Sequence, residues 1–477
     1  LKNNKTSTLF VALLFGLILL GLYLPLIALN QTYLINNPIP AEYLTFQEKS
    51  TLFGITTDYG LMGNFPNIKL ASDMIVEGNL PLWNPYVGLG YPLAADTTHH
   101  IFSPLNVGFL LPVEYWDLPL LFVAWVAGFS TFLFLRNLGL NFTSSIAGGI
   151  IFMLSGTFTW FVTNPNPFVA MVTPLILYSL DKTFKNRNPK YIILLCFSFG
   201  FSILGAHLQS LFIQFFLILF YLFYRNTVFL IFQKNTLKNS FKEIFTIAGK
   251  SSLRVFAGLL GGVSLVSFYV FFVLDFFKNG ILDNAIQYAF VEFKTFALAR
   301  LVIPYILGDM TRMWTTNTEW VSGFGYAGSI ALFFAVFSLY YVKNKTFPER
   351  LTPIFFLLMS LLGLMRLANI PIVSSIHALP IFDIIHFGTY SGLLIVFGFT
   401  VAAAFGINYV CHEKIYKKTV LIVGLSTLAI IGLLLLPVIL EFSTTEHLSP
   451  FISESEIQTC IIFQVFQSIF FISISAM

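Results

Sequence analysis

Long apolar runs separated by short polar segments dominate the chain. A helix needs roughly 20 apolar residues to cross about 30 Å of hydrocarbon. The run at 8–29 is long enough and lacks the small-residue cleavage site of a signal peptide. Further runs lie near 118–135, 143–162, 167–180, 191–206, 208–224, 253–274, 324–342, 351–367, 388–408, 419–440 and 457–477. The pattern predicts an all-α integral membrane protein with about 11–12 transmembrane helices.

Lysine and arginine are concentrated in every second connection between these runs. If the N-terminus is cytoplasmic, the connections that return to the cytoplasm carry Arg136; Lys182, Lys185, Arg187 and Lys190; Arg225 through Arg254; Lys343, Lys345 and Arg350; and Lys414, Lys417 and Lys418. The 225–254 connection holds six Lys/Arg against one acid, Glu243. Because basic residues favour the cytoplasmic side, we expect a multi-pass protein of the cell membrane with its N-terminus inside.

Two long connections then fall outside, at 30–117 and 275–323. The first carries eight acids and two bases, and is rich in proline, glycine and aromatic residues. A loop of this length at a membrane surface is usually functional. We expect residues 1–440 to form one transmembrane domain. Residues 441–477 would add an outer loop and a possible last helix, and we expect one or both chain ends to be incomplete.

The composition supports a membrane protein and excludes several other classes. Of 477 residues, 57% are hydrophobic and 10% are charged, with a mean hydropathy of +0.82. Soluble globular chains are about 25% charged, so this chain cannot cover its surface with charged groups. The net charge of +4 is small and indicates no nucleic-acid partner. The three cysteines are far apart and form no CxxC pair, which predicts neither disulfides nor a zinc site.

The densest group of polar and aromatic residues lies in the first outer loop, between Asp58 and Pro104. Residues Phe65 to Glu77 have helical spacing, with Ile68, Ala71, Ser72 and Ile75 on one side, and predict a short helix in the membrane interface. Repeated proline and glycine from Leu80 to Pro92 prevent the helix from continuing. Such a segment beside a bilayer must bury its backbone polar groups in protein or line a wet cavity.

This loop also carries a specific resemblance. An acid after the first run is followed by GNLPLWNPYVGLGYP at Gly78–Pro92 and by Ser-Pro-Leu at Ser103–Leu105. This order resembles the bacterial YfhO-like membrane proteins, which look like members of the GT-C superfamily of polyprenyl-phosphate-sugar-dependent glycosyltransferases. LGAHLQ at Leu204–Gln209, GFGYAGSIAL at Gly323–Leu332 and LPIFDIIHFGTYSGLL at Leu379–Leu394 agree with it. The resemblance covers about residues 8–440 and implies a GT-C-like fold.

The resemblance implies transfer of a sugar from a polyprenyl phosphate to an envelope glycan or lipid acceptor on the outer face. In that superfamily the base is an acid in the first outer loop, and Asp58 matches this position. Burial raises the pKa of a carboxylate toward neutrality, which suits a base that deprotonates an acceptor hydroxyl. Direct attack by that hydroxyl inverts the anomeric carbon. The leaving phosphate is already ionised and needs cationic stabilisation more than a general acid.

Further residues are candidates for substrate binding, and each has a structural alternative. Trp83 and Tyr86 either stack on sugar rings or anchor the interface, and Asp96 either orients the acceptor or caps a turn. His207 and Gln209 either bind substrate or cap a helical hairpin. Arg300 or Arg312 either grips the lipid phosphate through its guanidinium or forms a surface salt bridge. Asn84, Tyr91, His99 and His386 complete the candidate set.

We expect no cofactor. A divalent metal held by Asp96, His99 and His100 is the weighed alternative, although adjacent histidines usually point in different directions and no further ligand spacing supports such a site. Two other functions compete with the transferase. A flippase for lipid-linked saccharides would show paired broken helices and ionisable residues at mid-membrane, whereas a non-catalytic scaffold would tolerate the loss of Asp58.

Overall fold

The structure is a computed structural model that describes residues 2–28, 64–112, 115–159, 164–236, 241–279, 295–303, 325–345, 347, 349–368, 370–375 and 387–441. Its regular elements in these ranges are helices, apart from one isolated antiparallel bridge between Asn84 and Tyr91. Four helical segments are long and apolar enough to cross a membrane: Asp117–Asn137, Leu208–Ile231, Gly392–His412 and Lys417–Pro437. A fifth is the pair Phe245–Leu265 and Ser267–Asn279, bent by 72°. The chain is therefore an all-α membrane protein.

Each apolar run predicted between residues 8 and 440 coincides with helix. The runs correspond in order to α1 (Lys2–Ala28), α3 (Asp117–Asn137), α4 (Phe142–Met153) with α5 (Gly156–Thr159), α6 (Asn166–Ala170) with α7 (Thr173–Lys185), α8 (Pro189–Leu204), α9 (Leu208–Thr236), α10 (Phe241–Leu265) with α11 (Ser267–Asn279), α12 (Ser329–Asn344), α13 (Leu351–Leu367), α16 (Gly392–His412) and α17 (Lys417–Glu441). Several of these helices have only 12–17 residues, below the usual span length. The count of 11–12 spans stays a prediction, and the run at 457–477 lies outside the described residues.

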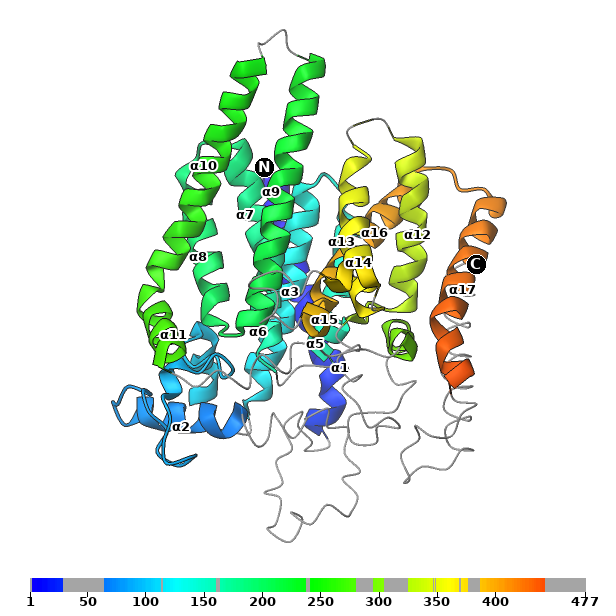
Figure 1. Ribbon diagram of the computed structural model, residues 1–477. Coiled ribbons are helices and arrows are strands. Elements are labelled where there is room, and N and C mark those ends of the chain that lie inside the picture. The colour runs from blue at the N-terminus through cyan, green and yellow to red at the C-terminus, as the bar shows by residue number, and fades with distance from the viewer. Residues whose placement is uncertain are drawn as a thin grey trace.

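Short elements complete the described fold. They are α2 (Phe65–Val76), η3 (Leu93–Ala95), η4 (Pro104–Leu110), η7 (Thr295–Leu301), α14 (Pro371–Ser374) and α15 (Phe387–Tyr390). The C-terminal end of α9 and the N-terminal end of α10 lie at one end of the bundle (Figure 1). The connections between α12 and α13 and between α16 and α17 lie at the same end. Helix α2 lies at the opposite end (Figure 1). Three of the five basic segments predicted to share one side of the membrane thus share one end of the bundle, while its orientation in the cell stays a prediction.

Helix α16 lies at the centre of one half of the bundle, between α4, α12 and α13. Its spanning segment is 78% buried, whereas that of α17 is 22% buried. Small residues allow this packing, since Gly398 lies against Ser360 and Phe356 of α13 and Gly406 lies against the Phe334 carbonyl of α12. Apolar side chains gain little by leaving lipid for another helix, so close backbone approach through small residues favours association in a membrane.

Replacement of Gly406 by Ala is expected to lower the melting temperature of the purified protein by several degrees. The added Cβ would collide with the Phe334 carbonyl oxygen, and overpacking costs about 1–3 kcal/mol, more than the roughly 1 kcal/mol that alanine gains in helix propensity. The matched control is Gly424→Ala on α17, where no atom lies within 4 Å of the added Cβ. Equal melting temperatures for Gly406→Ala and the wild type would contradict the α12–α16 contact.

Candidate functional site

Helix α2 (Phe65–Val76) confirms the short helix predicted for Phe65 to Glu77 in the first outer loop, while its place in the membrane interface stays a prediction. Pro66 occupies its first turn, where the missing N–H costs nothing, and the chain turns away at Gly78 with φ of +83°. The buried face carries Ile68, Ala71 and Ser72 as predicted. Ile75, predicted on the same side, lies in the last turn of the helix, and its side chain is 42% exposed.

The segment after α2 is irregular, as its proline and glycine content predicted. Asn84 and Tyr91 exchange two backbone hydrogen bonds of 2.8 and 2.9 Å and close a compact loop. Gly90, with φ of +101°, makes room for the Trp83 indole, because a Cβ there would lie 2.5 Å from the indole nitrogen. Trp83 is 50% exposed and Tyr86 is 81% exposed. The loop therefore presents two aromatic faces outward from a fixed backbone.

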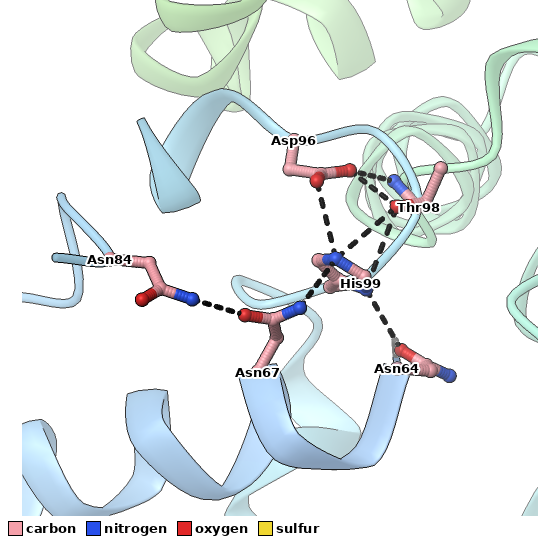
Figure 2. Close-up of polar contacts among 6 residues, drawn as sticks. All are labelled: Asn64, Asn67, Asn84, Asp96, Thr98 and His99. Carbon is pink, nitrogen blue, oxygen red and sulfur yellow. Dashed lines mark hydrogen bonds and ion pairs between the residues drawn. The ribbon is translucent and has the colours of Figure 1, made fainter. Parts of the chain in front are cut away.

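A chain of buried amides connects this loop to α2 and then to His99 (Figure 2). The backbone N–H of Tyr86 donates to Asn84 Oδ1 at 2.8 Å, which fixes the orientation of the Asn84 amide. Asn84 Nδ2 therefore donates to Asn67 Oδ1 at 2.7 Å, and Asn67 Nδ2 is directed at His99 Nε2 at 2.9 Å. On the other side of the ring, His99 Nδ1 lies 3.3 Å from Asn64 Oδ1. The His99 ring is therefore held from both sides.

Asp96 is the acidic partner of His99. Its Oδ2 lies 3.2 Å from His99 Nε2, and its Oδ1 accepts hydrogen bonds from the backbone N–H, at 2.8 Å, and the hydroxyl of Thr98. Burial raises the pKa of the Asp96 carboxyl, but the hydrogen bonds from His99 and Thr98 and the charge of His99 outweigh it, so the pKa lies below its ordinary value. Burial and the Asp96 charge raise the pKa of Tyr91 to about 12. The carboxylate is thus ionised beside a neutral phenol at neutral pH.

Two groups with opposite requirements face His99 Nε2. When Nε2 carries a proton it donates to Asp96, and when it lacks one it accepts from the Asn67 amide. The Asp96 side chain is 21% exposed and that of His99 is 6% exposed, so the carboxylate is the accessible end of the pair. This arrangement can accept a hydrogen bond from a hydroxyl group.

His100 points away from this pair. Asn106 Nδ2 donates to the His100 and Ile101 carbonyls, which leaves Asn106 Oδ1 to accept from His100 Nδ1 at 2.9 Å. The ring stacks on Phe168 with centroids 3.8 Å apart and ties the loop to α6. Within the described ranges, no group of three or more His, Cys, Asp or Glu residues is placed to hold a metal ion.

The remaining sequence candidates lie elsewhere. His207 precedes α9 and is packed inside the bundle. Its Nδ1 accepts a hydrogen bond from the Ser210 backbone N–H at 3.2 Å. Its ring packs against that of Tyr390, with the ring centroids 4.5 Å apart. Gln209 Oε1 is buried without a hydrogen-bond partner among the described residues. Arg300 is completely buried in η7, which packs on α17, whereas both alternatives weighed for it required an exposed side chain. Asp58, Arg312 and His386 lie outside the described residues, so their predicted roles stay predictions.

Four residues that form hydrogen bonds with Asp96, His99 or His100 were not predicted, namely Asn64, Asn67, Thr98 and Asn106. The sequence carried one signal for Asn67: it falls on the face of α2 that also holds Ile68 and Ala71, and a buried amide requires partners. The other three residues are placed by loop contacts that span 2 to 35 residues along the chain. No helical or strand periodicity marks such positions.

Acid is expected to destabilise the protein through His100. Burial lowers the pKa of this ring to about 3, whereas an unfolded histidine titrates near pH 6.5. The unfolded chain therefore binds the proton first: the stability held by neutral His100 is complete above about pH 6.5 and is lost as the pH falls from there toward 3. The His100→Asn variant is expected to melt lower than the wild type near pH 7 and to lose less on acidification to about pH 5.

Asparagine is the chosen replacement because it tolerates the positive φ of 41° at this position. The control is His412→Asn at an exposed histidine, which should keep the full pH dependence. An unchanged pH dependence in His100→Asn would contradict this assignment.

Comparisons of the chain with protein-family models, with curated proteins and with solved structures found no match. The family resemblance of the loop motif therefore stays a prediction. The structure describes an all-α membrane protein. Its loop between α2 and α3 carries a partly exposed carboxylate, Asp96, beside a buried histidine, His99.

Proposed function

We propose that this protein is a membrane glycosyltransferase of the GT-C type. It moves a sugar from a polyprenyl phosphate to a glycan or lipid acceptor on the outer face of the cell membrane. The observation that carries the proposal is the Asp96–His99 pair, held 3.2 Å apart by buried amides in the loop that bears the family-like motif. This site lies at the end of the bundle opposite the basic connections (Figure 1). With 11–12 spans and a cytoplasmic N-terminus, that end faces outward.

The proposed reaction is a direct displacement. Asp58 removes the proton from the acceptor hydroxyl, the oxygen attacks the anomeric carbon, and the bond from that carbon to the phosphate oxygen breaks with inversion. The phosphate leaves as an anion on its lipid, stabilised by Arg312, because Arg300 is completely buried. The role of Asp58 rests on its position in the resemblance, shortly after the first span.

The Asp96–His99 pair binds and orients the acceptor in this proposal. An ionised carboxylate accepts a hydrogen bond from a sugar hydroxyl, and charge-assisted bonds are roughly twice as strong as neutral ones. The exposed rings of Trp83 and Tyr86 offer flat faces for the apolar side of a sugar. Because the Asn84–Tyr91 bridge fixes the backbone of the loop that carries these rings, less backbone entropy is lost when substrate binds.

The flippase alternative is less well supported. Transporters commonly pair discontinuous helices in two related halves. Among the described helices, one pair passes as a broken span, α10 with α11. The Asp96–His99 pair lies in the loop between α2 and α3, at one end of the bundle rather than in its middle.

Replacement of Asp58 by Asn or Ala is expected to reduce sugar transfer at least about 100-fold, the lower range of general-base contributions. The assay uses labelled polyprenyl-phosphate sugar in proteoliposomes and measures the new glycosidic bond. Full activity in Asp58→Asn would exclude its role as base. A protein that moves labelled donor between leaflets without forming product is a flippase.

Two further variants complete this experiment. Asp73→Asn is the matched control, because Asp73 is an exposed acid of the same loop, paired with Lys69 at 2.5 Å, and its loss should leave transfer unchanged. Asp96→Asn is expected to raise KM for the acceptor about tenfold, the loss of roughly 1.4 kcal/mol of binding, with a smaller change in kcat. A lower kcat at constant KM would contradict the orienting role of Asp96.

A further inference from the structure

A pocket of about 910 Å³ opens in the basic half of the bundle, between the C-terminal end of α7, the second half of α9 and the first half of α10. Figure 1 shows this half opposite α2, so the pocket is separate from the candidate site described above. Five cations line it: Lys185, Arg187, Arg225, Lys250 and Arg254. The rest of its wall is mostly apolar, from Phe184, Val228, Phe229, Ile247 and Leu253. The pocket thus combines positive charge with an apolar wall.

One acid balances part of this charge. Asp181 is completely buried in α7 and forms ion pairs of 2.7 Å with Lys185 and with Arg225 of α9. It also accepts a hydrogen bond of 2.6 Å from Asn137 of α3. A buried carboxylate with these partners holds α3, α7 and α9 together. Its single charge is already shared by two cations and leaves none for the others.

The other three cations form no ion pair within the part of the chain that the structure describes. Arg254 is oriented by hydrogen bonds from its guanidinium to the Phe184 carbonyl at 3.3 Å and the Ser251 hydroxyl at 2.9 Å. Its Nε is buried and finds no acceptor among the described residues. A buried donor without an acceptor is costly, and like charges around one cavity repel each other. An anion in the pocket would relieve both.

Membrane orientation alone does not account for this arrangement. The positive-inside rule explains why basic residues gather at one end, and Lys417 and Lys418 at the start of α17 satisfy it as exposed side chains. It does not require five cations to line one cavity, nor a guanidinium oriented by backbone and hydroxyl oxygens. These features are typical of a binding site for an anion.

We propose that this pocket binds a phosphate group. Arginine and lysine are the usual partners of phosphate oxygens, and basic pockets between transmembrane helices bind the head groups of anionic lipids. The phosphate can belong to a lipid or to a small soluble molecule. The apolar wall favours the lipid, because the first carbons of its tails would cover Phe229 and Ile247.

The test measures ligand binding by the full-length protein with native mass spectrometry. The probes are phosphatidic acid, phosphatidylcholine and inorganic phosphate, and the pocket variant carries Lys250→Gln with Arg254→Gln. The wild type is expected to bind phosphatidic acid at least about tenfold more tightly than this variant, a difference of roughly 1.4 kcal/mol. The control, Lys417→Gln with Lys418→Gln, removes two exposed charges from the same end and should bind as the wild type does.

Melting temperatures of all three proteins in phosphatidylcholine show whether the substitutions disturb folding. If the pocket variant melts early, Arg254→Lys replaces it, because this change keeps the charge and removes the planar fork. If the wild type binds inorganic phosphate more tightly than phosphatidic acid, and the pocket variant loses this binding, the phosphate site is supported. That result rejects a lipid as the source of the phosphate group. Equal binding of phosphatidic acid by the wild type and the pocket variant overturns the proposal.

Discussion

A polar group that is shielded from water must find its partner within the protein, and this requirement determines where polar side chains lie in the structure. Leaving such a group without a partner costs about 1–3 kcal/mol, and more if it is charged. The loop after α2 meets this requirement with a chain of amides that begins at a backbone N–H of Tyr86 and ends at His99. Asp181 meets it with three partners from three helices.

The same requirement gives the two ends of the bundle different chemistry. At one end, neutral amides surround a single carboxylate, Asp96, and leave it partly accessible beside exposed aromatic rings. At the other end, the buried carboxylate of Asp181 forms ion pairs with Lys185 and Arg225, and guanidinium and ammonium groups line a cavity. The first arrangement suits recognition of hydroxyl groups, and the second suits recognition of phosphate. The proposed transfer of a sugar from a lipid phosphate would use both.

The helices were predictable from the sequence because each depends on a local apolar run. The packing of those helices was not, because it depends on small residues such as Gly398 and Gly406 meeting a particular neighbour. Within the site, the sequence indicated Asn84 through its place in the loop motif, and Asp96 and His99 as polar residues of the same outer loop. It did not indicate Asn64, and it gave Asn67 only a place on the buried face of α2, because both residues depend on contacts with His99 across 32 to 35 residues. Arg300 was predicted near the surface, but the bundle buries it completely.

The central claim is that the Asp96 loop and the basic pocket lie on opposite sides of the membrane, with the loop outside. Cysteine labelling tests this directly in a protein whose native cysteines, Cys196, Cys411 and Cys460, are replaced by serine. A membrane-impermeant maleimide applied to intact cells is expected to label Tyr86→Cys, at an 81% exposed position of the loop. Lys414→Cys, between α16 and α17, should react only after the membrane is made permeable. Labelling of both positions from the same side would contradict the account.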